Sequence, residues 1–153
     1  MEKYVKDSYT EQVQILTQSH MNGFGRLFGG QLMKWIDIVA AVVARRHSEC
    51  NVTTVLVEGL EFKKPARAND TLVLKGHITY AGKTSMEVKV NTYIEKLNGE
   101  KLLINTAFVV LVALDENDKP TTVPKLILTN EKEEKDFSDA LLRKEQRMLT
   151  NSK

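Results

Sequence analysis

The chain is short of the residues on which several classes of protein depend. Its 153 residues include one cysteine, Cys50, which excludes an intrachain disulfide and is typical of a reducing compartment. The purely apolar runs, such as Ile38 to Ala44, are far below the roughly 20 residues that a membrane-spanning helix requires. The charged N-terminal segment lacks the apolar core of a signal peptide. We therefore expect a soluble cytoplasmic protein that does not enter a membrane.

Net charge and histidine are also scarce. The formal net charge of +2 is too small to predict binding to nucleic acid. His20, His47 and His77 lie far apart and lack the spacing of a metal site, so no metal ligands are predicted. Ser85 is not part of a G-x-S-x-G elbow, and Cys50 has no evident orienting partner. Neither is therefore expected to be a catalytic nucleophile.

What is present is the composition of an ordinary globular protein, with 42% apolar and 27% charged residues. This length suits one domain, residues 1–153, rather than two. There is no internal repeat, low-complexity tract or linker.

The spacing of apolar residues predicts a strand, a long helix, four further strands and a C-terminal helix. Residues 11–17 alternate like a strand, and residues 30–47 are apolar on almost every face, which is typical of a buried helix. The strands after residue 52 are joined by short turns, which predicts a mostly antiparallel sheet. In the strand of residues 84–97 the alternation places Glu87 on the solvated face. The sequence thus predicts an α+β architecture, with one buried helix against a long, curling antiparallel sheet.

A glycine-rich segment precedes the long helix. Gly23 and Gly25 begin like a dinucleotide-binding motif, but the third position is Phe28, and no phosphate-loop motif is present. Two interpretations then remain. The glycines only turn the chain, or Gly29 and Gly30, at the predicted helix start, expose N–H groups that have no internal acceptor. Such groups lie at the positive end of the helix and suit a developing oxyanion.

Asp37 is the one carboxylate of this apolar helix. One interpretation is a salt bridge with Lys34, three residues earlier. The other is a chemical role. We favour it because so apolar a helix is not expected to carry a series of solvent-exposed salt bridges. Ala40, Ala41 and Ala44 share the face of Asp37, so a thin substrate or another backbone can approach it closely.

These residues together resemble the signature of hotdog-fold acyl-CoA thioesterases, in the group of bacterial, mitochondrial and cytosolic acyl-CoA hydrolases. The signature reads Asn-x-x-Gly-x-x-Phe-Gly-Gly from Asn22 to Gly30, followed by Met33 and Asp37. "VTTVLVEGLEFKKPARANDTL", "YAGKTSMEV" and "FVVLVALDENDKPTTVP" extend the similarity over about residues 9–126. Asn69 stands where the family usually has glycine before Asp70, an exchange of one turn residue for another.

The resemblance implies a hotdog fold: a long central helix wrapped by a curved antiparallel sheet, with a core of about residues 9–126 and a helical tail of about 130–153. Two subunits would pair into a continuous sheet and share their active sites, and three such dimers would form a hexamer. The implied reaction is hydrolysis of fatty acyl-CoA to a fatty acid and CoA, with no metal and no organic cofactor.

The resemblance also assigns roles to individual residues. Asp37 would be the general base or the nucleophile, Asn22 would hold the reacting groups, and the amides of Gly29 and Gly30 would face the thioester oxygen. The residues implied to contact substrate or CoA are Phe28, Phe62, Arg67, Gly82, Lys83, Thr84 and Ser85. Lys63 and Lys64, beside Pro65, have two interpretations, contacts to CoA phosphates or solvated surface.

Two other functions remain open. A hotdog-fold hydratase or dehydratase would need a histidine paired with a carboxylate in a loop, and the sequence shows no such pairing. A non-catalytic acyl-CoA sensor would bind the ligand and regulate a partner, and it would leave Asp37 without a role. We therefore favour hydrolysis.

Overall fold

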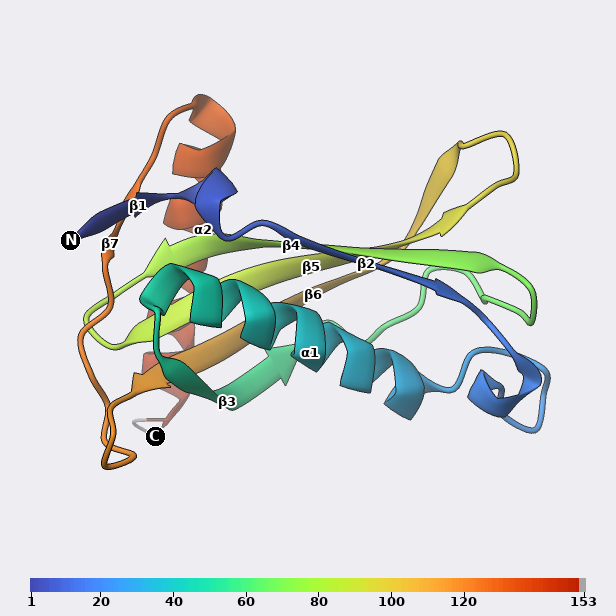
Figure 1. The fold of residues 1–153 in the computed structure, drawn as a ribbon, viewed down its shortest axis with the longest axis horizontal. Coiled ribbons are helices and arrows are strands. Elements are labelled where there is room, and N and C mark those ends of the chain that lie inside the picture. The colour runs from blue at the N-terminus through green and yellow to red at the C-terminus, as the bar shows by residue number, and fades with distance from the viewer. Residues whose placement is uncertain (152–153) are drawn as a thin grey trace.

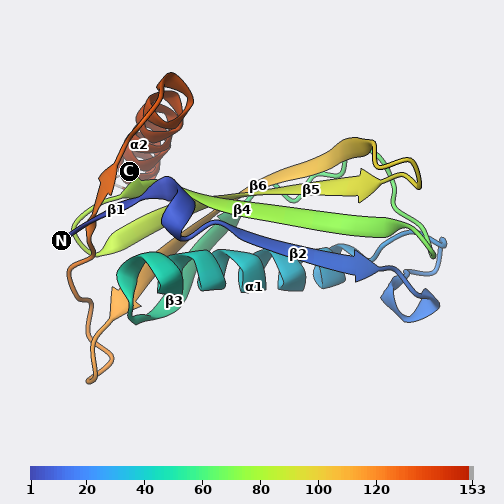
Figure 2. The same ribbon diagram turned by 45° about the horizontal axis from the view of Figure 1, so that its top comes forward.

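The computed structural model describes residues 1–151 and places a curved antiparallel sheet around one long helix (Figure 1). The helix α1 (Gly29–Ser48) lies along the concave face of the sheet, and α2 (Glu131–Asn151) lies across the opposite face (Figure 2). The strand order is β2-β4-β5-β6-β3, with β2 (Thr10–Ile15), β3 (Asn51–Glu58), β4 (Thr71–Ala81), β5 (Ser85–Glu95) and β6 (Lys101–Leu114). This is the predicted α+β hotdog architecture, and the prediction is confirmed.

The core forms where α1 meets the sheet. Leu32, Ile36, Val39 and Val43 recur at helical spacing and are at most 1% exposed. The helix crosses β4 at Gly76, where an added Cβ would lie 2.7 Å from Val39 Cγ1, so only glycine permits this approach. Sheet residues complete the core, among them Leu72, Leu74, Ile78, Met86, Val88, Val90, Ile104, Val109 and Leu111.

One side of α1 is left uncovered, contrary to the expectation of a wholly buried helix. Met33 and Ile38 are 42% and 44% exposed. The reason is geometric, because the sheet of a single chain wraps only part of the helix circumference. An apolar helix face open to solvent is typical of a surface that another molecule covers.

The connection between β3 and β4 was predicted to be a short turn, and this expectation was wrong. Residues 59–70 cross the sheet, because β3 pairs with β6 at one edge whereas β4 lies between β2 and β5. The other turns are short as predicted. At Asn98 and Gly99, for example, the Lys96 N–H donates to the Glu100 carbonyl at 2.8 Å, and Gly99 has a φ of +89°.

A small parallel sheet outside the main one was not predicted. It pairs β1 (Glu2–Tyr4) with β7 (Lys125–Ile127), and two single-turn 3-10 helices, Val5–Asp7 and Gln18–His20, flank β2. His47, fully buried near the end of α1, donates from Nε2 to the Pro124 carbonyl at 2.8 Å, just before β7. Three-residue strands carry too little periodicity to be recognised in a sequence.

Glu87 is 2% exposed and does not face solvent as the alternation predicted. The alternation itself is correct, but α2 covers this part of the convex face. Arg143 of α2 makes a bidentate ion pair with Glu87, through Nη2 to Oε1 at 2.8 Å and Nε to Oε2 at 3.0 Å. Thr79 also donates to Oε1 at 2.7 Å. The buried carboxylate is therefore paired and hydrogen-bonded, as burial of a charge requires.

Candidate active site

The start of α1 offers two free backbone donors. The chain is extended at Phe28, and no side chain caps the helix. The Gln31 and Leu32 N–H groups donate to the Phe28 carbonyl at 3.0 and 3.2 Å. Within residues 1–151, the N–H groups of Gly29 and Gly30 have no acceptor. They lie at the positive end of a 20-residue helix, an arrangement that can bind an oxyanion.

Asn22 lies beside this helix start, in the loop that leads into it. Its Oδ1 accepts the backbone N–H groups of Phe24 at 2.9 Å and Arg26 at 3.2 Å, so the amide is held in one orientation with Nδ2 left to donate. Asn22 and Gly29 line the same open cavity of about 360 Å³. The rest of its wall is formed by Arg26, Leu27, Phe62, Lys63, Lys64, Pro65 and Ala66.

Asp37 lies further along α1 and makes a short hydrogen bond to β3. Thr54 Oγ1 donates to Asp37 Oδ1 at 2.6 Å, which orients the carboxylate and leaves Oδ2 to accept a proton. The alternative role of Asp37, a salt bridge with Lys34, is not formed among the described residues. The side chain is half-buried and opens into a groove of about 310 Å³.

Thr54 was not singled out from the sequence. Its strand, β3, was included there in the resemblance to the thioesterases, but none of its residues was given a role. The available signal was a threonine at a strand position facing the apolar helix, and this pattern is too common to indicate a site. Only the packing of β3 against α1 places the Thr54 hydroxyl beside Asp37.

A single chain does not bring Asp37 and Asn22 into one cavity. The groove at Asp37 is lined by Gly30, Met33, Lys34, Thr54 and Val57, whereas Asn22 and Gly29 line the other cavity. Seven residues separate Gly30 from Asp37, which is about 10 Å along the helix axis. Asp37 lies on the uncovered side of α1, so the groove is open where a second molecule would meet it.

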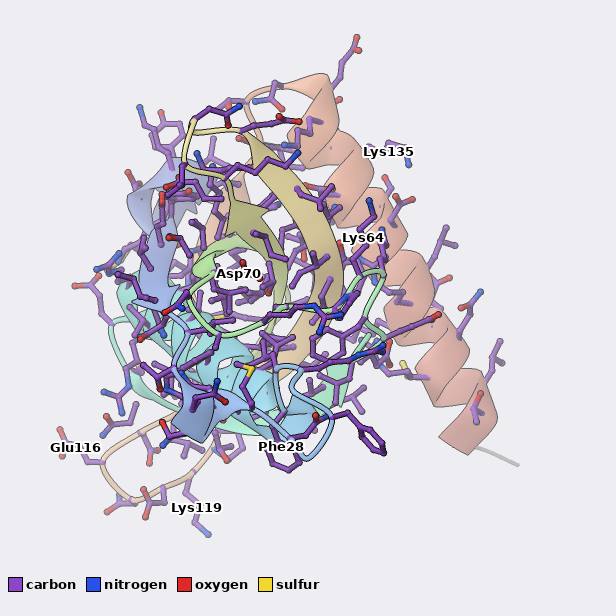
Figure 3. All side chains as sticks on the ribbon, turned by 90° about the vertical axis from the view of Figure 1, so that its right-hand side faces the viewer. Phe28, Lys64, Asp70, Glu116, Lys119 and Lys135 are labelled. Atoms are coloured by element: carbon purple, nitrogen blue, oxygen red, sulfur yellow. The ribbon has the colours of Figure 1, made fainter. Side chains whose placement is uncertain are left out.

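The predicted substrate-binding residues fall into two groups at opposite ends of β4. Phe28 and Phe62 lie at the helix start, and a Cβ at Gly30 would stand 2.6 Å from Phe28 Cε2. Phe28 is 55% exposed and points outward at this end of the molecule (Figure 3). Arg67 is exposed in the turn that precedes β4, where its N–H donates to Asp70 Oδ2 at 2.9 Å. Asn69 has a φ of +76° in this turn, so the residue that replaces the usual glycine adopts a conformation asparagine tolerates.

The second group, Gly82 to Ser85, forms the turn between β4 and β5, at the far end of β4 from Arg67. The Gly82 N–H donates to the Ser85 carbonyl at 2.8 Å, and the Lys83 carbonyl accepts from Val123 at 2.9 Å. The Thr84 carbonyl accepts from Ala113 at 3.0 Å. One chain therefore does not unite the two groups.

A histidine–carboxylate pair is present, but it joins a strand and a helix and does not lie in a loop, where a hydratase or dehydratase was expected to need one. His77 Nε2 lies 3.1 Å from Asp136 Oδ2, between β4 and α2. Burial lowers the pKa of His77, and the Asp136 carboxylate opposes that shift. The pair is on the convex face, whereas Asp37 is on the concave side, so it does not serve the same site.

Of the remaining candidate residues, His20 makes contacts that stabilise the loop before α1. His20 accepts the Thr17 N–H at Nδ1 (3.0 Å) and packs edge-on to Trp35, with ring centroids 4.9 Å apart. Over residues 1–151, no three metal-ligating side chains are grouped as a metal site would require. None of the helices in the described part of the chain has the length and hydropathy of a membrane span.

A curved antiparallel sheet around one long helix, with an uncapped glycine start and a carboxylate–hydroxyl pair on the open side, defines a hotdog-fold protein. A family model described as the thioesterase superfamily matches residues 24–100. The chain belongs to this superfamily.

Relatives and solved structures agree with that assignment. An uncharacterised acyl-CoA thioester hydrolase of Bacillus subtilis is 35% identical over 132 residues, which cover 86% of this chain and 77% of the relative. A crystal structure of an apo-hexameric acyl-CoA thioesterase superposes with a TM-score of 0.90 at 34% identity, covering 98% of this chain and 97% of that one. An acyl-CoA hydrolase of Staphylococcus aureus, solved with butyryl coenzyme A, gives 0.90 at 30% identity, with coverages of 99% and 93%. The predicted family and enzyme class are confirmed.

Proposed function

We propose that this protein hydrolyses fatty acyl-CoA to a free fatty acid and CoA, with Asp37 as the catalytic carboxylate. The observation that carries the proposal is the 2.6 Å hydrogen bond from Thr54, which fixes Asp37 at the open apolar side of α1. The names of the relatives support the substrate class.

The spacing of Asn22, Asp37 and Thr54 along the chain is a second support for their proposed roles. The S. aureus hydrolase has also been solved with alanine in place of an asparagine, an aspartate and a threonine. Those positions are separated by 15 and 17 residues, the same intervals that separate Asn22, Asp37 and Thr54 in this chain.

The chemistry follows from the donors and acceptors present. The thioester oxygen would accept hydrogen bonds from the Gly29 and Gly30 amides, which stabilise the negative charge that develops on it. Asp37 would take a proton from a water molecule as the water oxygen bonds to the carbonyl carbon. The carbon–sulfur bond then breaks, and the thiolate of CoA receives the proton. Direct attack by Asp37 through an anhydride is the second possible course. Neither course needs a metal or an organic cofactor.

The site would be completed by a second subunit. If two copies pair with antiparallel α1 helices, Asp37 of one copy can face Gly29 and Asn22 of the other. The same pairing would bring the Gly82–Ser85 turn of one subunit toward the Phe62 and Arg67 end of its partner, so both groups could line one CoA path. Three such dimers would make a hexamer, which fits the hexameric thioesterases among the similar structures. We also propose that residues 1–153 form one domain and that the enzyme works in the cytoplasm.

The alternatives predict different behaviour. A sensor would bind acyl-CoA without releasing thiol. A hydratase or dehydratase would use a histidine beside its carboxylate, but the His77–Asp136 pair is on the other face of the sheet from Asp37. The oriented Asp37 favours hydrolysis over both.

The test is thiol release from palmitoyl-CoA, followed with Ellman's reagent, for the natural protein and Asp37→Asn. We expect the variant to lose at least about a hundredfold in kcat, the scale of a lost general base, while acyl-CoA binding persists because the amide is isosteric. Asp139→Asn on the exposed side of α2 is the matched control and should retain full turnover. Near-normal turnover in Asp37→Asn would show that Asp37 is not the catalytic carboxylate. Binding of acyl-CoA without turnover in the natural protein would favour the sensor.

A further inference from the structure

The helix α2 crosses the convex face of the sheet from an inner strand to a free edge. One hydrogen bond and two ion pairs mark its path in chain order: Asp136 with His77 of β4 at 3.1 Å, then Arg143 with Glu87 of β5 at 2.8 Å, and Arg147 with Glu58 of β3 at 3.4 Å. In the described sheet β3 pairs only with β6, so its other side is an open edge.

The helix does not stop at that edge. It continues four residues beyond Arg147 to Asn151, which adds about 6 Å at 1.5 Å per residue. Neighbouring strands lie about 4.8 Å apart, so these four residues are long enough to extend over the position that a further strand paired with β3 would occupy. Figure 3 shows this end of α2 standing clear of the body of the molecule.

Apolar side chains are exposed at this point on both faces of β3. On the convex side, Val55 of β3 and Met148 of α2 are 61% and 64% exposed and line one groove of about 340 Å³. On the concave side, Met33 of α1 is 42% exposed and lines a groove with Thr54 and Val57 of β3. A free strand edge with exposed apolar groups above and below it is suited to a strand from another molecule.

We propose that the last turn of α2 is a clasp that packs, through Met148, on the convex face of a second copy of this chain. The proposal rests on the pairing of two subunits that the proposed function requires, with the free edge of β3 in each subunit at the shared boundary of the two sheets. Two-fold symmetry makes the contact reciprocal, because each copy offers a clasp and accepts one. The clasp would hold together the dimer that completes the active site.

The experiment compares Met148→Glu with Leu142→Glu in the full-length chain. Leu142 is a matched control on the same helix, 56% exposed and on the side turned away from the sheet. The carboxylate introduced by Met148→Glu would lie one turn from Lys144 and can pair with it, so the folded subunit should tolerate the charge. Molar mass is measured by light scattering on a dilution series, and thiol release is measured in parallel at high and low protein concentration.

We expect Met148→Glu to raise the dimer dissociation constant at least about tenfold, the effect of about 1.4 kcal/mol. Its turnover should fall on dilution and return at high protein concentration, whereas Leu142→Glu should behave like the natural protein. Equal dissociation of Met148→Glu and the natural protein overturns the clasp. So does dissociation caused by Leu142→Glu alone, because the outward face of α2 would then be the interface.

These outcomes separate the clasp from the proposed function. If the natural protein dimerises through Met148 but releases no thiol, the clasp stands and the hydrolase proposal fails. If Met148→Glu dimerises normally while the natural protein hydrolyses acyl-CoA, only the clasp fails.

Discussion

Two inactive variants should restore activity to each other when their subunits mix. Asn22→Ala removes the amide beside the helix start, and Asp37→Ala removes the carboxylate. In one chain these residues line separate cavities, and Asp37 is about 10 Å along the helix axis from Gly30. Attack on a bound carbonyl needs a separation of about 3 Å. Each intact site should therefore take Asn22 from one subunit and Asp37 from the other.

The size of the recovery follows from counting sites. Equal amounts of the two variants that pair at random give about half mixed dimers. In a mixed dimer one site contains both alanines, and the other contains the natural Asn22 and Asp37. About a quarter of the natural turnover should therefore return.

The assay is thiol release from palmitoyl-CoA after the two variants are co-refolded, with each variant refolded alone as the control. Mixing without unfolding should give less recovery, because subunits must exchange. If both residues act within one subunit, every site in the mixture keeps one defect. A mixture as inactive as its components would then refute the shared site.

Three further predictions follow from single contacts. Gly30→Val should lower turnover at least about a hundredfold with an unchanged circular dichroism spectrum, because a branched side chain at the helix start would obstruct the thioester oxygen and crowd the Phe28 ring, which lies 2.6 Å from the added Cβ. Full activity of this variant would place the oxyanion donors elsewhere. Arg143→Met should reduce the free energy of unfolding in urea by about 3 kcal/mol, because Glu87 stays buried without its cation. The double variant with Glu87→Gln should recover most of this loss. A small loss of stability in the single variant would contradict this account. Burial lowers the pKa of His47 below its ordinary 6.5, so the unfolded chain binds the proton more readily and the free energy of unfolding should fall as the pH drops below about 6.5. His47→Gln, whose amide can still donate to Pro124, should show a shallower decline between pH 8 and 5, and an equal decline would assign the effect to His77 and other groups.

Much of the architecture was predictable because it depends on local order in the chain. The period of the apolar residues distinguishes the long helix from the strands, and turn residues such as Asn98 and Gly99 mark a hairpin. The position of Gly29 at the start of α1 is equally local, since it depends on the apolar pattern that begins after the glycines. The resemblance to hotdog thioesterases added the family, which the comparisons confirmed.

Other features required the folded chain, because they depend on which distant surfaces meet. Thr54 is an ordinary strand threonine until β3 packs on α1 and brings its hydroxyl to 2.6 Å from Asp37. Glu87 follows the polar alternation of its strand, yet Arg143, 56 residues later, buries it. The same holds for the crossing of residues 59–70. Periodicity reports which face of an element is apolar, but it carries no information on what will cover that face, and long-range packing alone decides this.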